Sequence, residues 1–476
     1  MLEWSWNKLM DNLALQTPSI DLIVIGAGPA GLSAVATAAE LGLSVVLLDE
    51  QPNAGGQVFR GVEHSSQNLK GILGPDYAGG ALLLARARSA GVKHIGQAVV
   101  WRIETDGTVV FSIDGKAQTM RATRILLATG ALERAAPLPG WTLPGVMTVG
   151  AAQILLKQSS MLPKRAILAG SGPLLYLFAS QMIRAGVPPV ALVETQTMTE
   201  LRRAIRFLPK ALKDWRTLLK GLKMLSLIRS AGIPRYKSAS DLEVIGSGKA
   251  QALRFYVSGN VHQIDCETVL LHQGVVPNPQ INRALDLPHV WNNRQRSFIP
   301  QTDEWGAVLD TDIHIAGDGA GIVGAEASEV QGILAALDIV HRLGHLGVAV
   351  RDQRAAPLRK KLRRAIASRP FLDHAYPPTE QVLNPADSTV ICRCEEVTAG
   401  EIRALTKQGD IGPNQIKSFT RCGMGPCQGR YCGLSVTQIL ADSLGKSADE
   451  VGYFHIRYPI KPVTLQELAS LAENAD

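Results

Sequence analysis

Five of the six cysteines lie in one short stretch near the carboxyl end of the chain, between residues 392 and 432. Clustered thiolates of this number bind zinc or an iron–sulfur cluster. Cys392 and Cys394 are separated by a single residue, unlike the Cys-x-x-Cys knuckle of most zinc sites, and four glycines beside the later cysteines offer free backbone amides near the sulfurs. The pattern therefore favours an iron–sulfur cluster, with zinc as the alternative.

A glycine-rich turn is the second place where chemistry is expected. Gly26, Gly28 and Gly31 form Gly-x-Gly-x-x-Gly directly after a strand-like run at 21–25, and an alanine-rich helical segment follows. The first glycine permits the tight turn, the second lets the backbone approach a pyrophosphate, and the third lets helix and strand pack closely. The positive end of the helix dipole then faces the phosphates. The turn predicts a dinucleotide site.

Two acids end the next predicted strand, at 45–48, where such a fold places its ribose ligand. They are Asp49 and Glu50. The interval from Gly26 to Glu50 equals that from Gly170 to Glu194 in a second copy of the pattern, so Glu50 is preferred over Asp49.

Three companions favour FAD over NAD as the ligand of the first turn, and together they are more specific than the glycines. They are Gly56 with Gln57 after the acids, Thr129 with Gly130 at the end of a buried-looking strand, and Gly317 with Asp318 at the end of another. For Asp318 the competing interpretation is a helix cap.

The second copy comprises a strand at 165–169, Gly170 and Gly172, a helix, and a strand that ends at Glu194. Its third glycine position holds Leu175, whose bulk is expected to push the helix from the strand. Productive NAD(P)H binding is therefore not expected, while an adenine nucleotide held differently stays open. The chain offers no Cys-x-x-Cys here for a dithiol relay.

These elements predict an α/β protein with one dinucleotide domain inserted in another. The predicted ranges are 20–145 and 290–345 for a discontinuous FAD-binding domain, 146–289 for the inserted domain with a basic helical pair at 196–235, 346–385 for a linker, 386–457 for a small cysteine domain, and 458–476 for a tail.

Composition excludes several classes of function. The net charge of +7 comes largely from two helical-looking basic stretches with few aromatic residues, so nucleic-acid binding is not expected. The first basic stretch is interpreted as a solvated helix face, against a phosphate cover or subunit contact. The amino terminus does not read as a secretory signal, and no apolar run is long enough to span a membrane. A cytoplasmic protein is expected, with any membrane association made through partners.

Residues 20–340 resemble the two-dinucleotide-domain flavoproteins of glutathione reductase shape, and that resemblance implies that Asp318 accepts a hydrogen bond from the ribityl chain of FAD. The end of the chain resembles the bacterioferritin-associated-ferredoxin type of [2Fe-2S] domain. Its spacing is matched by Cys392, Cys394, Cys427 and Cys432, which the resemblance implies as cluster ligands; Cys422 has no place in it.

The whole combination looks like the alpha subunit of the opine oxidase family, which includes subunits of hydrogen cyanide synthase, D-hydroxyproline dehydrogenase and dye-linked L-proline dehydrogenase. The resemblance implies a hetero-oligomer in which a beta subunit with its own FAD oxidises a carbon–nitrogen bond, while this chain receives the electrons and supplies no catalytic residue. It also allows an FMN at a subunit interface and a small third, ferredoxin-like subunit.

Two other functions stay open. One is a self-contained NAD(P)H-dependent flavin and iron–sulfur reductase, against which Leu175 counts. The other is a non-catalytic redox or metal-handling protein, against which the retained Glu50 and Asp318 count. Opine, proline-type and glycine substrates are all compatible with the sequence.

Overall fold

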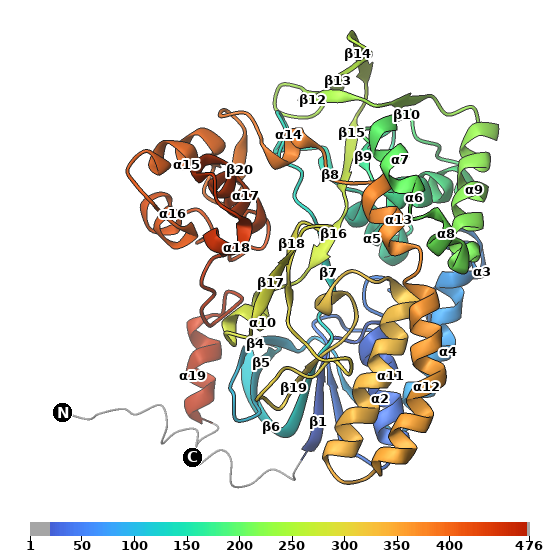
Figure 1. Ribbon diagram of the computed structural model, residues 1–476, viewed down its shortest axis with the longest axis vertical. Helices are drawn as coiled ribbons and strands as arrows, with labels where there is room; N and C mark the ends of the chain where they lie inside the picture. Colours follow the sequence, from blue (N-terminus) through green and yellow to red (C-terminus); the bar gives the residue numbers. More distant parts are fainter. Residues whose placement is uncertain (1–19, 474–476) are drawn as a thin grey trace.

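The computed structural model describes residues 20–473, so the prediction about a secretory signal falls outside the described residues. Two α/β units lie one above the other, and a small helical unit flanks them (Figure 1). The fold confirms the predicted class of two dinucleotide-binding-like domains, one inserted in the other.

The first unit contains a parallel sheet whose central strands β1 and β2 are largely buried runs of Val, Ile and Leu, as expected for a sheet covered on both faces. Its order is β3 (Lys93–Ile95), β2 (Val45–Leu48), β1 (Ile20–Ile25), β6 (Lys116–Leu127) and β19 (Ile313–Ile315). The long β6 continues into an antiparallel layer with β5 (Thr108–Ile113) and β4 (Val99–Ile103).

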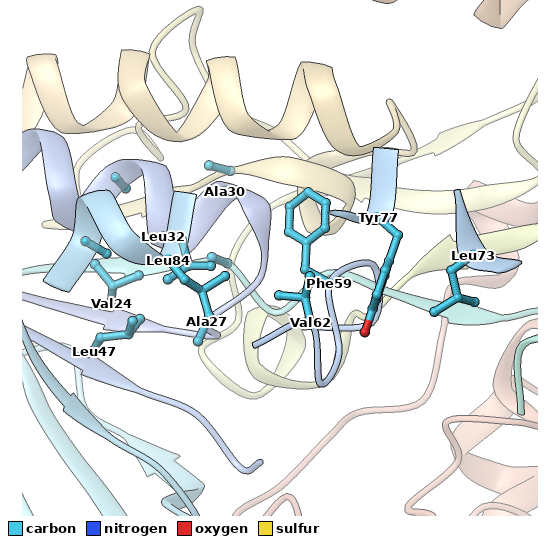
Figure 2. Packing of buried hydrophobic residues seen from close by; sticks show 14 of the residues in the cluster. Val24, Ala27, Ala30, Leu32, Leu47, Phe59, Val62, Leu73, Tyr77 and Leu84 are labelled. Carbon is cyan, nitrogen blue, oxygen red and sulfur yellow. The ribbon is translucent and has the colours of Figure 1, made fainter. Parts of the chain in front are cut away.

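Helices α2 (Pro29–Glu40), α4 (Pro75–Ser89) and α11 (Ala325–Arg342) belong to this unit, with the short α3 (Gln67–Leu73) beside α4. Gly332 lets α11 approach α2 closely, because a Cβ at that position would lie 2.1 Å from the carbonyl oxygen of Ala30. Figure 2 shows the packing below these helices, where Leu32, Leu84 and Phe59 belong to one buried cluster.

The inserted unit has a second parallel sheet. Its order is β11 (Arg235–Lys237), β10 (Ala191–Glu194), β9 (Ala166–Ser171), β15 (Thr268–Gln273) and β8 (Val146–Thr148). An antiparallel layer of β12 (Ser240–Ile245), β13 (Ala252–Val257) and β14 (Asn260–Asp265) adjoins it, and Cys266, the cysteine outside the cluster, is buried in this unit's core. Helices α5 (Val149–Ser159) and α6 (Pro173–Arg184) also lie here.

The predicted basic helical pair is in fact four short elements. They are α7 (Met198–Ile205), α8 (Leu208–Ala211), the 3-10 turn η1 (Leu212–Asp214) and α9 (Trp215–Ser230). The basic periodicity alone predicted two helices. Pro209, at the start of α8, breaks the helical segment between α7 and α9.

Between the two units runs a two-stranded ribbon of β7 (Ala131–Glu133) and β16 (Val275–Pro277), followed by a hairpin of β17 (His289–Asn292) and β18 (Ser297–Pro300). The remaining connecting elements are α10 (Gln280–Ala284), the 3-10 turn η2 (Gly317–Ala320), α12 (Val348–Ala365), α13 (Arg369–Ala375) and α14 (Glu380–Leu383).

The small unit is mostly helical. It contains β20 (Val390–Cys392), β21 (Val397–Thr398), α15 (Ala399–Thr406), α16 (Pro413–Thr420), α17 (Gly433–Leu444) and α18 (Ala448–Val451). The last helix, α19 (Leu465–Glu473), leaves this unit and packs against β6 of the first one. Among the helices of residues 20–473, none combines the length and apolarity that crossing a membrane requires.

Candidate cofactor-binding sites

The first glycine turn is as tight as its sequence predicts. Gly26 has a φ of +107°, and a Cβ there would lie 2.4 Å from the carbonyl oxygen of Ala128. A Cβ on Gly31 would lie 1.9 Å from the carbonyl oxygen of Gly26, so only glycine lets α2 start this close to β1. A Cβ on Gly56 would lie 2.7 Å from the Cα of Gly28. The two predicted glycine segments therefore meet, backbone against backbone.

Asp49 and Glu50 have different surroundings. The carboxylate of Asp49 is buried and accepts hydrogen bonds from the backbone N–H groups of Ala27 (2.6 Å) and Gln51 (2.7 Å). The Glu50 side chain is 47% exposed and forms an ion pair with Lys461, in the segment that leads to α19. Asp49 is thus the acid that touches the glycine turn.

Strand register identifies the same residue. Leu48 lies opposite Ile25, so Asp49 follows opposite Gly26, just as Glu194 lies opposite Gly170 in the second unit. The equal spacing that favoured Glu50 is misleading because the connection from helix to strand is longer in the second copy, 185–190 against 41–44. The register therefore gives Asp49, and not Glu50, the position beside the first glycine turn that Glu194 has beside the second.

Thr129 and Asp318 join the glycine turn at the carboxyl ends of β6 and β19, the edge at which such sheets bind nucleotides. The Thr129 hydroxyl is buried and, within the described residues, has no hydrogen-bond partner. Asp318 Oδ1 accepts from the N–H groups of Val323 (2.8 Å) and Gly324 (2.9 Å), so it orders the turn that leads into α11. An orphaned buried hydroxyl beside the open turn fits a bound dinucleotide.

The predicted Gln57 contributes its backbone to the contact between the two units. Its side chain is exposed, whereas its carbonyl and that of Val58 accept hydrogen bonds from the buried ammonium of Lys157 on α5 (2.8 and 3.1 Å). Burial, aided by Arg60, lowers the pKa of Lys157 to about 7. Lys157 therefore pins the loop after Gly56 to the inserted unit.

In the second unit, Glu194, the acid of the dinucleotide-binding pattern, already has hydrogen-bond partners within the chain. Glu194 is 0% exposed, and both its oxygens bond to the guanidinium of Arg235 (2.7 and 3.0 Å), while the Tyr176 hydroxyl donates to Oε1. A ribose could reach this carboxylate only by breaking a buried ion pair, which costs several kcal/mol. Glu194 is built into the core.

The glycine turn of the second unit is also altered. A Cβ on Gly172 would lie 2.6 Å from Nε2 of His272, and the His272 ring is fixed through Nδ1 to Oε1 of Glu133 (2.5 Å). Gly172 has a φ of +139°, against −80° for Gly28, so α6 starts differently from α2, and Leu175 is fully buried behind it. These features support the prediction that NAD(P)H does not bind here in the usual manner.

Glu133, His272, Arg235 and Lys461 were not identified from the sequence. A histidine inside the apolar run of β15 was the available signal for His272, and Glu133 follows directly on the Thr129–Gly130 turn. Neither Arg235 nor Lys461 carries a local signal, because each meets its partner only in the folded chain.

The five clustered cysteines gather in the small unit. The Sγ atoms of Cys392, Cys422 and Cys432 all lie within 4.8 Å of one another and are buried. Cys394 is exposed and interacts with the half-buried Cys427 and with Cys392. The structure thus brings Cys422, which the sequence left unassigned, next to two of the four predicted ligands.

This donor set fits an iron–sulfur cluster. Hydrogen bonds from the thiols of Cys422 and then Cys432 lower the pKa of Cys392, so the group readily provides a thiolate. Two of the four glycines lie at the sulfurs: the backbone of Gly423 hydrogen-bonds to Cys392, and a Cβ on Gly425 would lie 3.0 Å from Sγ of Cys394. Five thiols are available where a cluster of this type uses four.

The cysteine unit docks on the segments that join the two α/β units. The Trp141 indole donates to the carbonyl of Val390 (2.7 Å), and the guanidinium of Arg393 lies over the Trp141 ring. On the other side, Gln280 donates to the carbonyl of Gln428 (3.1 Å). The chain segments that carry the cysteines therefore face the ribbon region between the nucleotide folds.

Comparison with known proteins agrees with this architecture. Residues 20–352 match the family model of pyridine nucleotide-disulphide oxidoreductases, and residues 386–472 match the sarcosine oxidase A3 domain. The solved structure of L-proline dehydrogenase from P. horikoshii aligns with a TM-score of 0.70 at 20% identity, over 95% of this chain and 79% of that one. At that identity the likeness concerns the fold.

Two curated relatives cover nearly the whole chain. An opine oxidase subunit of Rhizobium meliloti is 42% identical over 95% of this chain and 99% of its own, and hydrogen cyanide synthase subunit HcnB of Pseudomonas aeruginosa is 31% identical over the same shares. The matched fold supports a flavoprotein with FAD at the Gly26 turn. The chain belongs to the pyridine nucleotide-disulphide oxidoreductase family, within the group that contains these opine oxidase and hydrogen cyanide synthase subunits.

Proposed function

We propose that this chain is the electron-transferring flavin and iron–sulfur subunit of a hetero-oligomeric amino-acid dehydrogenase or oxidase acting on the CH–NH bond of an opine or other secondary amine. The similarity to the opine oxidase subunit over 95% of the chain carries the proposal. That relative is named as one subunit of its enzyme, and so are the hydrogen cyanide synthase and sarcosine oxidase relatives. The substrate is oxidised on a partner.

In this proposal FAD lies along the Gly26 turn with its ribose at Asp49 and its ribityl chain near Thr129 and Asp318. A [2Fe-2S] cluster is held by Cys392, Cys394, Cys427 and Cys432. The flavin and the cluster supply the redox chemistry, whereas the residues of this chain bind and orient them. An FMN at a subunit interface and an adenine nucleotide in the inserted unit belong to the same proposal.

The partners proposed are a beta subunit that carries the substrate-oxidising FAD and a small ferredoxin-like third subunit, in the cytoplasm. The docking of the cysteine unit on the interdomain ribbon supports an internal route for electrons, because it fixes one redox site relative to the other.

The geometry of the second unit weighs against the alternative of a self-contained NAD(P)H reductase. Glu194 forms an ion pair with Arg235, and the His272 ring fills the space directly beside Gly172. Both would have to move before a nicotinamide dinucleotide could bind there in the usual manner.

The decisive test is anaerobic. The chain alone and the complex purified with its co-expressed partners are mixed with NADH, with NADPH, and separately with opines and imino acids, while visible and electron-paramagnetic-resonance spectra are recorded. We expect bleaching only of the assembled complex and only by an amine substrate. Reduction of the isolated chain by NADH or NADPH would instead establish the reductase.

A further inference from the structure

Helix α9 carries an apolar stripe on its exposed side. Trp215, Leu219 and Leu222 recur at the spacing of one helix face and are 50%, 40% and 64% exposed, although Met224 and Ile228 on the opposite face are buried. Leu212, just before the helix, is also exposed. Figure 1 shows α9 along the outer edge of the inserted unit.

Cations lie directly beside this stripe. Arg216, Lys220 and Lys223 each follow an apolar stripe residue by one position, which places them next to it around the helix. Helix α7 repeats the arrangement, with exposed Met198, Leu201 and Ile205 flanked by Arg202 and Arg206. The pattern thus occurs twice in one segment.

The positive charge of this segment is largely unbalanced. Within residues 20–473 only Lys220 of the flanking cations forms an ion pair, with Asp76 on α4. The segment's two acids are occupied elsewhere, since Glu200 caps α7 and Asp214 accepts a hydrogen bond from Ser368. Among the described residues, the cations of α7 to α9 without an ion-pair partner are Arg202, Arg203, Arg206, Lys210, Lys213, Arg216, Lys223 and Arg229.

A solvated helix face, the interpretation first given to this stretch, does not explain three large apolar side chains in one exposed row. A protein partner would have to bury several lysines, which the cores of protein interfaces avoid. An anionic bilayer accommodates both features: apolar side chains enter the boundary of the acyl region, while Lys and Arg reach the headgroups. A tryptophan at the end of the stripe is typical of that boundary.

We propose that the exposed face of α9, formed by Trp215, Leu219, Leu222, Arg216, Lys220 and Lys223 and here called the α9 face, binds the surface of a bilayer containing anionic lipid. The contact is peripheral and is made by this chain directly, which goes beyond the electron-transfer function.

The test uses the full chain, alone and in its complex, in co-flotation with phosphatidylcholine vesicles with or without phosphatidylglycerol. We expect binding that requires phosphatidylglycerol and weakens with added salt. Combined Trp215→Ser, Leu219→Ser and Leu222→Ser should weaken binding about tenfold or more, because each apolar side chain contributes to insertion. Arg216→Gln with Lys223→Gln should remove most of the dependence on anionic lipid, and it leaves the Lys220 ion pair in place.

Leu309→Ser with Leu465→Ser is the matched control, since these leucines are exposed and lie outside α9 and the helices beside it, and it should bind like the parent. Flavin and cysteine-site absorption should be unchanged in every variant, so that lost binding is not lost folding. The proposal is overturned if the parent ignores anionic vesicles in both forms, if the stripe variant floats as well as the control, or if that variant instead loses its partner subunits in gel filtration.

Discussion

At the end of β2 a buried and an exposed carboxylate stand side by side, and their surroundings assign them different tasks. Asp49 is held by two backbone N–H groups and faces the glycine turn, whereas Glu50 is tied to Lys461. A carboxylate with fixed orientation loses little freedom when a ribose binds, so we expect Asp49 to be the better ligand.

We therefore predict that Asp49→Ala weakens FAD retention about tenfold or more, since a hydrogen bond to a charged group contributes about 1.5–3 kcal/mol. Glu50→Gln should change it less than about twofold, a difference near 0.4 kcal/mol that one exposed group can account for. Flavin release is followed by fluorescence during dialysis of the two variants. Equal losses in both, or a larger loss in Glu50→Gln, would restore Glu50 as the ligand.

The small unit has five cysteines for the four ligand positions of a cluster, so single substitutions can identify the cysteine that is not a ligand. If Cys394 and Cys427 complete the cluster with Cys392 and Cys432, then Cys422 remains a thiol next to Cys392. Cys422→Ala should keep the visible absorption of the cluster, while Cys394→Ala and Cys427→Ala should lose it. Iron content and electron-paramagnetic-resonance signals distinguish the sets; loss of iron in Cys422→Ala would show that the buried trio supplies the ligands.

Sequence reasoning at this scale succeeded where chemistry is local and failed where register decides. The glycines of the first turn were predictable because a Cβ at Gly26 or Gly31 has no room, whatever surrounds the turn. The choice between Asp49 and Glu50 depends on the length of the connection before each strand, which spacing along the chain does not reveal. The neighbours of Cys422 likewise depend on how the small unit folds.

At the scale of elements, a buried charge network joins a strand to two helices. Asp338 of α11 is 1% exposed; its oxygens interact with His314 of β19 (3.1 Å), Arg342 of the same helix (2.5 Å) and Arg351 of α12 (2.9 Å). Burial alone would raise the pKa of Asp338, but the hydrogen bonds from His314 and Arg342 outweigh it and lower the pKa from 3.8 to about 2.

The lowered pKa of Asp338 predicts how acid changes the stability of the folded chain. A carboxylate whose pKa is lower in the folded chain stabilises it above the unfolded pKa, and that contribution is lost as pH falls from about 4 to about 2. Asp338→Asn should be less stable by about 3 kcal/mol at pH 7, and the gap to the parent should shrink by about 2 kcal/mol toward pH 2. The free energy of unfolding by urea, determined for parent and variant at several pH values, measures this difference.

Asp352→Asn is the matched control, because Asp352 also pairs with Arg351 but is exposed. It should cost less than about 1 kcal/mol at any pH. A gap for Asp338→Asn that stays constant down to pH 2 would contradict the lowered pKa. Burial lowers the pKa of His314, so protonation of His314 in acid destabilises the folded chain. This effect is the same in the parent and in the Asp352 control.

For the molecule as a whole, the order of domains follows from repeated local patterns, and the sequence predicted it for that reason. The contacts that fix the units to each other are not periodic. The route of residues 458–473 is the clearest case: they were predicted as a tail, but Ile460 donates its N–H to Trp101 and α19 packs on β6. The segment is short and terminal, and its apolar residues indicate a buried face without identifying the strand that it meets.

We make a final prediction about how residues 458–473 hold the cysteine unit on the first α/β unit. Leu471 of α19 is buried against Trp101, Val110 and Ala117, and the N–H of Ala117 donates to the Ser470 hydroxyl (2.9 Å). Leu471→Ala should cost about 3 kcal/mol of docking energy, enough to raise the undocked population about a hundredfold. Hydrogen exchange at Ala117 and proteolysis near residue 462 report it.

Leu465→Ala provides the comparison, because Leu465 lies on the same helix but is 85% exposed and should leave both rates unchanged. Flavin and cluster should stay bound in each variant, since neither leucine lies at the glycine turn or among the cysteines. Electron transfer between the two sites in the substrate-reduced complex should nevertheless slow in Leu471→Ala alone, because α19 is one of the contacts that hold the cysteine unit on the flavin unit. Unchanged exchange at Ala117 would mean that α19 stays docked without the Leu471 side chain. Faster exchange with unchanged electron transfer would mean that the Trp141 and Gln280 contacts suffice to hold the cysteine unit.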